Sequence, residues 1–377
     1  MILTRSKGFP HGGTHSLPVA RRQARCFLKL AMFQKSSTGT RQNIHTAICA
    51  VILVAAAMVR AGLGAESPEL LASKDSAAVP QVGKRQPIKP IPLDLKLDAR
   101  KVTLGQALFH DVRLSRDGTI SCASCHEVAK GGTDGRAHST GIENATGAVN
   151  APTVLNSGLN FKQFWDGRAT TLEEQIDGPV HSVVELGSSW PEIVGKLRAT
   201  DYAARFATIY RDGLQPQNIK DAIAQFERSL ITPNSRFDKY LRGDDSALTA
   251  EEKAGYRVFK SHGCTSCHQG VNVGGNMFAT LGAMADYFAD RGNITKADYG
   301  RFNVTGQESD RFVFKVPSLR NVALTAPYFH DGTMARLEDA VIAMGQYQLG
   351  AALPAEDVAQ IVQFLKTLTG ELGGNPL

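Results

Sequence analysis

The chain has 377 residues, 42% of them hydrophobic and 21% charged, a composition typical of globular proteins that excludes a fibrous or largely disordered one. The net charge of +6 is unevenly distributed, because nine of the 42 basic residues and none of the 36 acidic ones lie in residues 1–65. The remainder holds 33 basic and 36 acidic residues. This balance argues against nucleic acid as a partner and suits a small soluble partner protein.

Residues 1–65 have the pattern of a signal peptide. A basic region precedes an apolar run over residues 47–59, and small residues follow at 61–65. The run has 13 residues, whereas a spanning helix needs roughly 20, so we expect cleavage and export to the periplasm; the alternative is a permanent membrane anchor. Met32 would open a signal of ordinary length, so we expect the true start there. Residues 66–85 are predicted to be flexible.

Four cysteines remain after the signal, in two C-x-x-C-H motifs: Cys122, Cys125 and His126, then Cys264, Cys267 and His268. Two thiols three positions apart can form thioethers with both vinyl groups of a haem, and the adjacent imidazole can ligate its iron. The alternatives are a zinc site, which needs four converging ligands, and a redox dithiol, which does not need the histidine. The motifs therefore favour two covalently bound haem c groups.

A segment of the first half recurs in the second at an offset of 165 residues: PTVLN at 152–156 matches PSLRN at 317–321, and FWDG at 164–167 matches FHDG at 329–332. Each half also ends in an amphipathic pattern, over residues 219–230 and 358–368. A capping box at Thr249 and Glu252 begins the first helix of the second half. We predict an all-α fold of two tandem cytochrome c-like domains, over residues 86–240 and 241–377.

The same offset places Met344 in the second half opposite Pro179 in the first. A methionine thioether can fill the sixth position of a haem iron, and a Met/His pair suits electron transfer. Proline has no side-chain ligand, so the first haem keeps a position for a substrate. A core methionine is the alternative role for Met344.

Seven stretches carry a family resemblance: SCASCH, NAPTVLN, QFWDGRATTLEEQ, GCTSCHQG, VGGNMF, FKVPSLRNVALTAPYFHDG and MGQYQLG. In this order they resemble the bacterial diheme cytochrome c peroxidase family, which includes the methylamine-utilisation diheme enzymes. The resemblance covers roughly residues 86–370. It implies that hydrogen peroxide is reduced to water at the haem held by His126, with electrons from a small cytochrome c or cupredoxin that pass through the haem of His268 and Met344.

The resemblance also implies roles for single residues. Glu185 matches the distal acid–base group, Gln175 its polar neighbour, and Trp165 the aromatic residue between the haems. Cleavage of peroxide requires a proton to move from one oxygen to the other, which a carboxylate within hydrogen-bond reach can do. The alternatives are a solvated loop glutamate and a tryptophan that only fills the core.

The family resemblance further implies a calcium ion held by the side chain of Asn150 and the backbone carbonyls of Thr325 and Pro327. Oxygen ligands of this kind suit a hard cation. No sequence motif marks such a site. A homodimer, as in relatives, is left open.

One position departs from the family pattern. Many members carry a histidine sixteen residues after the first haem histidine, which caps the iron until the other haem is reduced; here that position is Ile142. Isoleucine cannot coordinate, so we expect a first haem that is open without prior reduction. His138 is an alternative capping ligand.

Two other functions remain as alternatives. The missing capping histidine also resembles the methylamine-utilisation enzymes, which oxidise residues of a partner protein, although those carry a tyrosine where this chain has Met344. A plain diheme electron carrier would need both haems fully ligated, which Pro179 and Ile142 disfavour.

Overall fold

The computed structural model describes residues 86–377, and the predicted signal peptide, the start at Met32 and the segment 66–85 lie outside this part of the chain. The described part is helix-rich, as predicted. Two short two-stranded sheets accompany the helices.

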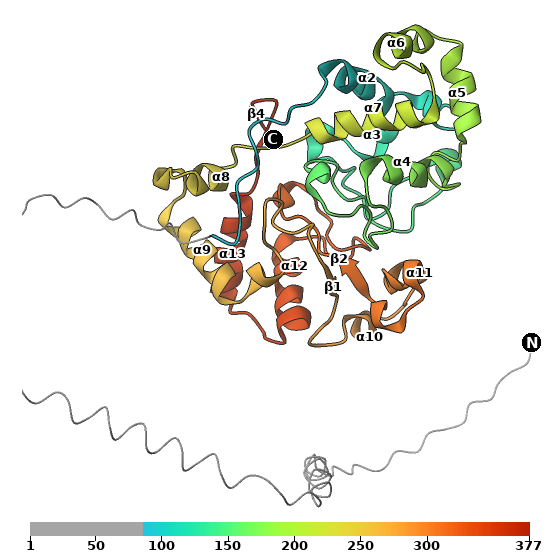
Figure 1. Ribbon diagram of the computed structural model, residues 1–377. Coiled ribbons are helices and arrows are strands. Elements are labelled where there is room, and N and C mark those ends of the chain that lie inside the picture. Colours follow the sequence, from blue (N-terminus) through green and yellow to red (C-terminus); the bar gives the residue numbers. More distant parts are fainter. Residues whose placement is uncertain (1–85) are drawn as a thin grey trace, which may run out of the picture. The chain divides into compact units, whose positions relative to one another are not determined.

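The first half, cyan to light green in Figure 1, is a group of helices around α7. Its helices are α2 (Ala99–Phe109), α3 (Cys122–Cys125), α4 (Leu172–His181), α5 (Trp190–Arg198), α6 (Tyr202–Ile209) and α7 (Pro216–Ser229). The predicted pattern of α7 is confirmed, since Ile219, Ile223 and Phe226 are buried in the core of this half. Proline at the first position of α7 suits its start, because the missing N–H has no partner within the helix there.

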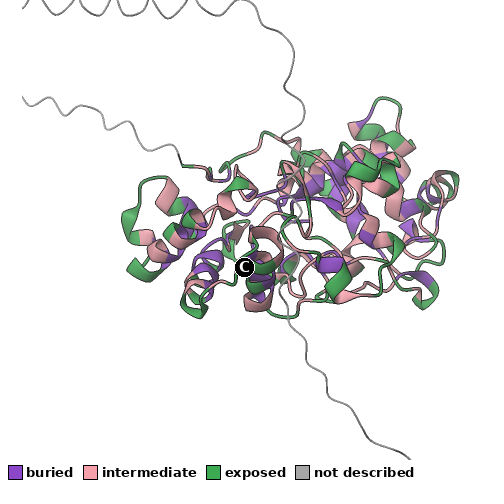
Figure 2. Cartoon of the chain, turned by 90° about the horizontal axis from the view of Figure 1, so that it is seen from below, coloured by how far each residue is buried: buried purple, intermediate pink, exposed green. Residues whose placement is uncertain are grey.

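The second half continues from yellow to red. Its helices are α8 (Arg236–Leu241), α9 (Ala250–Ser261), α10 (Tyr287–Arg291), α11 (Phe302–Thr305), α12 (Leu337–Ala343) and α13 (Ala355–Lys366). Strand β1 (Phe278–Thr280) pairs antiparallel with β2 (Val313–Lys315), and β3 (Glu371–Leu372) pairs with β4 (Asn375–Pro376). The capping box that starts α9 is confirmed, with Thr249 and Glu252 each bonding the other's backbone. Figure 2 shows buried positions in both halves.

In each half, two long helices cross at a glycine: α2 with α7, and α9 with α13. A Cβ at Gly105 of α2 would collide with the carbonyl oxygen of Ala222 in α7, and a Cβ at Gly255 of α9 would collide with that of Gln360 in α13. Only glycine allows the two backbones to approach this closely. The two halves therefore repeat the same helix crossing.

The repeat in the sequence is also a repeat of unusual backbone geometry. Asn156 and Asn321 have φ of 60° and 59°, and Phe164 and Phe329 have φ of 68° and 69°. Positive φ is uncommon for residues other than glycine, so its recurrence 165 residues later is specific. The bridges that close the two FxDG turns also correspond, Gln163 with Ala169 and Tyr328 with Met334.

The ends of the described chain cross between the halves. Residues 86–91 lie against the second half, where Ile88 forms a parallel bridge with Gly270 and is buried in that half's core. At the other end, Leu372 and Leu377 pack against the core of the first half. The segment that precedes the first half therefore packs on the second half. The segment that ends the second half packs on the first.

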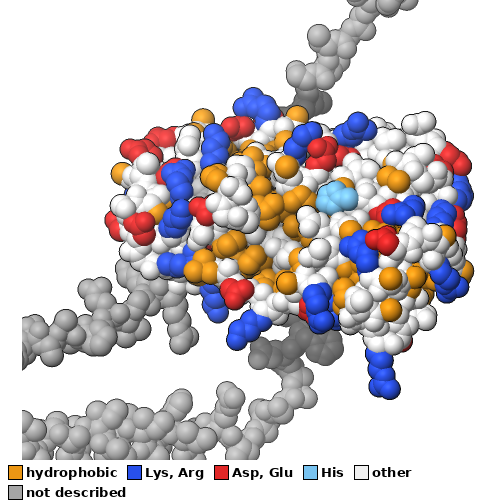
Figure 3. Space-filling model, turned by 90° about the horizontal axis from the view of Figure 1, so that it is seen from above, with side chains coloured by type: hydrophobic (Ala, Val, Ile, Leu, Met, Phe, Trp, Pro, Cys, Tyr) orange, Lys and Arg blue, Asp and Glu red, His pale blue; other side chains and the backbone are white. Residues whose placement is uncertain are grey.

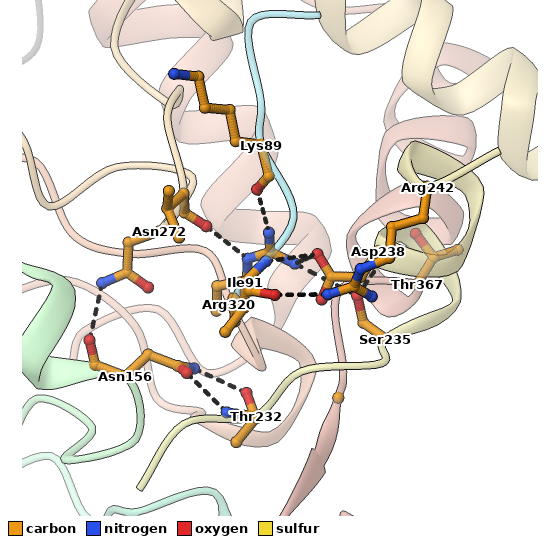
Figure 4. A network of polar contacts seen from close by, with 12 residues as sticks. Lys89, Ile91, Asn156, Thr232, Ser235, Asp238, Arg242, Asn272, Arg320 and Thr367 are labelled. Carbon is orange, nitrogen blue, oxygen red and sulfur yellow. Dashed lines mark hydrogen bonds and ion pairs between the residues drawn. The ribbon is translucent and has the colours of Figure 1, made fainter. Parts of the chain in front are cut away.

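A buried ion pair lies where the N-terminal segment meets the second half (Figure 4). Arg320 Nη1 is 2.8 Å from Asp238 Oδ1, and both side chains are fully buried. Arg320 Nη2 also donates to the carbonyl oxygen of Lys89 at 2.9 Å. These bonds satisfy a charge that would otherwise be costly to bury.

The same network contains both asparagines of the repeat. Asn156 Nδ2 donates to Thr232 Oγ1 at 2.8 Å, and Asn321 Nδ2 donates to the same oxygen at 3.0 Å. Thr232 lies in the connection between the halves and is fully buried. One threonine hydroxyl therefore joins the two copies of the repeat.

Candidate functional site

The first C-x-x-C-H motif lies on α3 and the residue that follows it. The N–H of His126 donates to the carbonyl oxygen of Cys122 at 3.0 Å, which keeps the imidazole next to the two thiols. The ring atom Nδ1 is 3.2 Å from the carbonyl oxygen of Gly132. With Nδ1 donating to that carbonyl, Nε2 is left as a metal ligand, and the ring is held in one orientation.

The second motif repeats this arrangement on a short 3-10 helix, η6 (Cys264–Ser266). The N–H of His268 donates to the carbonyl oxygen of Cys264 at 2.9 Å, and its Nδ1 is 3.4 Å from that of Val273. Both halves thus present an imidazole Nε2 beside a pair of thiols.

Burial shifts the ionisation of these groups away from that of a reactive redox dithiol. Burial raises the pKa of Cys122 to about 12 and of Cys264 to about 11. A reactive redox dithiol has a lowered thiol pKa, and zinc binds the thiolate. Burial also lowers the pKa of His268 to about 4, which keeps its imidazole neutral, the form that binds metals.

A cavity of about 560 Å³ opens beside the second motif. Cys264, Cys267, His268 and Met344 all line it, so the thioether and the imidazole face one space. The volume lies within the range of roughly 300–1,000 Å³ that is usual for cofactor pockets. Figure 3 shows apolar side chains gathered across the middle of one face of the molecule. The second half therefore offers a cradle that fits a large apolar group.

Met344 and its counterpart differ in local structure. Met344 begins a π-helical turn, η10 (Met344–Gln348), directly after α12. π-Helical turns are rare in proteins, and those that occur often lie at functional sites. Pro179 lies inside α4 and offers no ligand atom. The two corresponding positions therefore differ in backbone structure as well as in side chain.

Glu185 lies in the loop after α4, close to the first motif. Its carboxylate adds to the effect of burial in raising the pKa of both Cys122 and Cys125. Burial raises the pKa of Glu185 itself, although a hydrogen bond with Ser182 opposes the rise. The carboxyl is thus partly desolvated and next to the cysteines that would hold a haem.

Ile142 is fixed against the same loop. Its N–H donates to the carbonyl oxygen of Glu185 at 3.0 Å, and its side chain is 1% exposed. Gln175 lies on α4, one turn before Pro179, and is half-buried. His138 has a buried Nδ1 that finds no hydrogen-bond partner within residues 86–377.

Trp165 lies where the two halves meet. Its Nε1 donates to the carbonyl oxygen of Asn150 at 2.9 Å, and its indole makes an edge contact with the imidazole of His330, with ring centroids 6.4 Å apart. Trp165 also lines the cavity of the second half. It is therefore in contact with elements of both halves.

The three residues expected to hold calcium, Asn150, Thr325 and Pro327, all line the cavity described above. Asn150 Nδ2 donates to the carbonyl oxygen of Arg136 at 2.8 Å, which directs Oδ1 away from that bond. The set is neutral, so a cation here would need water ligands as well.

One polar cluster near Trp165 was not predicted from the sequence. His330 Nε2 is 2.7 Å from Asp298 Oδ1, and both residues are buried. Asp298, His330 and Asp331 have the spacing of a metal site, but Arg291 forms ion pairs with both aspartates and supplies the positive charge. The match of FHDG to FWDG could have drawn attention to His330, whereas Asp298 lies in no motif.

The comparisons with known proteins agree with this geometry. Residues 99–246 match the family model of the di-haem cytochrome c peroxidases. A cytochrome c peroxidase of Escherichia coli is 50% identical over 316 residues, which are 83% of this chain and 67% of that protein. A cytochrome c551 peroxidase of Nitrosomonas europaea is 47% identical over 289 residues, 76% of this chain and 85% of that protein. The crystal structure of a MauG-like protein associated with microbial copper homeostasis superposes with a TM-score of 0.65 at 32% identity, covering 77% of this chain and 95% of that one.

These likenesses define a class of haem-containing oxidoreductases. The chain belongs to the di-haem cytochrome c peroxidase family, which confirms the resemblance found in the sequence and implies two haem groups. Among the helices of residues 86–377, none has both the length and the apolar composition that a bilayer span requires.

Proposed function

We propose that the chain is a periplasmic peroxidase that combines hydrogen peroxide, two electrons and two protons into two waters. The observation that carries this proposal is the difference at equivalent positions, where Met344 stands in the second half and Pro179 in the first. A site with only one protein ligand can accept a substrate, and a site with two can hold an electron. The 50% and 47% identities to cytochrome c peroxidases support it.

Each half would hold one haem c through its own residues. Cys122 and Cys125 would form thioethers in the first half and His126 would ligate the iron; Cys264, Cys267, His268 and Met344 would do so in the second. The bound haems would supply iron that exchanges single electrons. The neutral imidazoles, buried thiols and apolar cavity suit this cofactor.

Glu185 would move the proton during peroxide cleavage. Its place near the first motif and the rise in its pKa through burial support this role, because a carboxyl of raised pKa binds a proton more readily than an ordinary one. Gln175 on α4 would orient the peroxide as a neutral hydrogen-bonding group. Trp165 would carry electrons between the halves.

We further propose that no reduction step is needed before peroxide can bind. Ile142 occupies the capping position and is packed against the Glu185 loop. An EPR spectrum of the oxidised protein near neutral pH should contain a high-spin haem signal. A spectrum with low-spin signals alone would contradict this, and loss of those signals in His138→Ala would then identify His138 as the cap.

A calcium ion at Asn150, Thr325 and Pro327, a homodimer, and a small cytochrome c or cupredoxin as donor complete the proposal. Asn150 of the first half and Thr325 and Pro327 of the second line one cavity, which supports the calcium proposal. Chelator treatment followed by metal analysis tests the ion, and light scattering tests the dimer.

The second candidate is an enzyme that oxidises residues of a partner protein, as the likeness to a MauG-like structure suggests. Its lower identity of 32% and the presence of Met344 favour the peroxidase. A plain electron carrier would leave Glu185 without a use.

The test is peroxide-dependent oxidation of a reduced small cytochrome by haem-loaded protein, compared between fully oxidised and half-reduced enzyme. We expect turnover without a lag in both states. Inert protein with two attached haems would overturn the proposal, and modified residues on a partner would favour the second candidate.

A further inference from the structure

Lys315, the last residue of β2, is a buried cation. Its side chain is 6% exposed, and burial lowers its pKa to about 8. Within residues 86–377 its Nζ atom has no hydrogen-bond or ion-pair partner. A buried ammonium without a partner is costly, so such a group points to a missing anion.

The charged side chains near Lys315 interact with other residues. Asp298 and Asp331 form ion pairs with Arg291, and His330 contacts Asp298. Phe314 and Val316, which flank Lys315 in the chain, are buried and apolar. The protein itself therefore offers no carboxylate to Lys315 in the part of the chain that is described.

The surroundings of Lys315 indicate which molecule would supply the anion. Lys315 lines the same cavity as Cys264, Cys267, His268 and Trp165. Its backbone N–H donates to the carbonyl oxygen of Trp165 at 2.8 Å, which fixes it between the second haem motif and the tryptophan.

The internal repeat supports this position. Lys315 corresponds to Asn150, and each stands two residues before the proline of its own half, Pro152 or Pro317. Both residues line the cavity beside the second haem motif.

We propose that Lys315 binds a propionate carboxylate of the haem attached at Cys264 and Cys267. This rests on the proposed haem in the second half. When the haem is bound, Lys315 would form an ion pair with this carboxylate inside the cavity. The pair keeps the propionate ionised, and the positive charge stabilises the reduced haem relative to the oxidised one.

The experiment uses full-length protein matured with both haems. Lys315→Met removes the charge and keeps the length of the side chain, Lys315→Arg keeps the charge, and Lys366→Met removes an exposed lysine of α13 as the control. Haem content is checked from the pyridine haemochrome spectrum. The midpoint potential of the Met-ligated haem is then measured by spectroelectrochemistry across neutral pH.

We expect a lower midpoint potential in Lys315→Met, which becomes pH-dependent because the unpaired propionate now takes up a proton. Lys315→Arg and Lys366→Met should stay near the wild type. An unchanged potential with unchanged pH dependence in Lys315→Met would overturn the proposal. If that variant fails to load haem, the propionate bending mode in resonance Raman decides: Lys315→Arg must shift it, and identical spectra would overturn the proposal.

These readouts separate the two proposals. A shifted potential in protein that never turns over peroxide would support Lys315 and contradict the peroxidase function. Normal turnover with an unshifted potential would do the reverse.

Discussion

The two halves share one backbone plan and differ in the charges placed on it. Both contain a pair of helices that cross at a glycine, and both hold an asparagine and a phenylalanine at positive φ in the same loop. Yet the buried Leu155 of the first half corresponds to the buried Arg320 of the second. Duplicated geometry thus leaves room for different electrostatics in the two halves.

The helix crossings reveal a further difference of this kind. Aligning Gly105 and Ala222 with Gly255 and Gln360 places Glu227 of α7 opposite Leu365 of α13. Leu365 lines the cavity of the second half, whereas Glu227 is 7% exposed and has an Oε2 atom with no hydrogen-bond partner within residues 86–377. The first half therefore buries an acid where the second buries a leucine.

The largest expected effect concerns Glu185, the proposed proton-transfer group of the first half. No proton transfer is proposed for the second half. Glu185→Gln should lower the peroxidase kcat by about 10²–10⁴-fold, the usual contribution of general acid–base catalysis. In the wild type, activity should fall as the pH drops through the raised pKa of Glu185, because the base becomes protonated. Steady-state kinetics against pH tests both. The exposed Glu143→Gln serves as control, and a Glu185→Gln enzyme with the wild-type rate and pH profile would contradict the assignment.

The second prediction concerns Arg320, whose counterpart is Leu155. Asp238→Ala should lower the free energy of unfolding by about 3–5 kcal/mol, since it leaves a buried arginine unpaired. The exposed pair of Asp245 and Lys253 is the control, and Asp245→Ala should cost no more than about 1 kcal/mol.

Denaturant unfolding followed by circular dichroism measures these changes. The double variant Arg320→Leu with Asp238→Leu replaces the buried ion pair with apolar side chains, as at Leu155 in the first half. It should be more stable than Asp238→Ala. Equal losses in both would show that the charge is not the cause.

The third prediction uses the pH dependence of Glu227. Burial raises its folded-state pKa to about 8, with Arg228 opposing the rise and Glu173 adding to it. In the unfolded chain a glutamate has a pKa of about 4.3. Folding therefore favours the protonated form, and wild-type stability should decrease as the pH rises from the unfolded to the folded pKa.

Glu227→Gln should remove most of this decrease and gain a few kcal/mol over the wild type above pH ~8. Unfolding curves at acidic and alkaline pH measure it. Glu127→Gln, which changes a more exposed acid paired with Lys130, is the control. Parallel pH profiles for wild type and Glu227→Gln would show that folding does not raise the pKa of this carboxyl.

The smallest effect separates crowded glycines from an open one. Gly105→Ala and Gly255→Ala should each cost about 1–3 kcal/mol, because the added methyl group forces two helices apart. Gly195→Ala on α5, where a Cβ meets no atom within 4 Å, should instead stabilise the protein by about 0.4–1 kcal/mol. Thermal unfolding of the three variants is sufficient. A stabilising Gly105→Ala would mean that the crossing can relax.

Features encoded locally were predictable from the sequence. The haem motifs, the capping box at Thr249 and the amphipathic patterns of α7 and α13 each depend on residues a few positions apart. The offset of 165 residues predicted the equivalence of the halves, and the recurrence of positive φ at Asn156 and Asn321 confirms it.

Features that join distant segments were not predictable. The crossing of residues 86–91 and 371–377 between the halves leaves no periodic pattern. The burial of Lys315 contradicts the ordinary preference of lysine for solvent, and the sequence cannot show a charge whose proposed partner is a cofactor. Asp298 and Glu227 acquire their neighbours only through packing.

The crossed ends have a mechanical consequence. Because Ile88 is buried in one half and Leu372 packs on the other, a protease cut between them, near residues 242–245, would sever the connecting chain without freeing either product. Each fragment would stay attached to the other through its terminal segment, residues 86–91 or residues 371–377. The two halves are thus interlocked through their terminal segments.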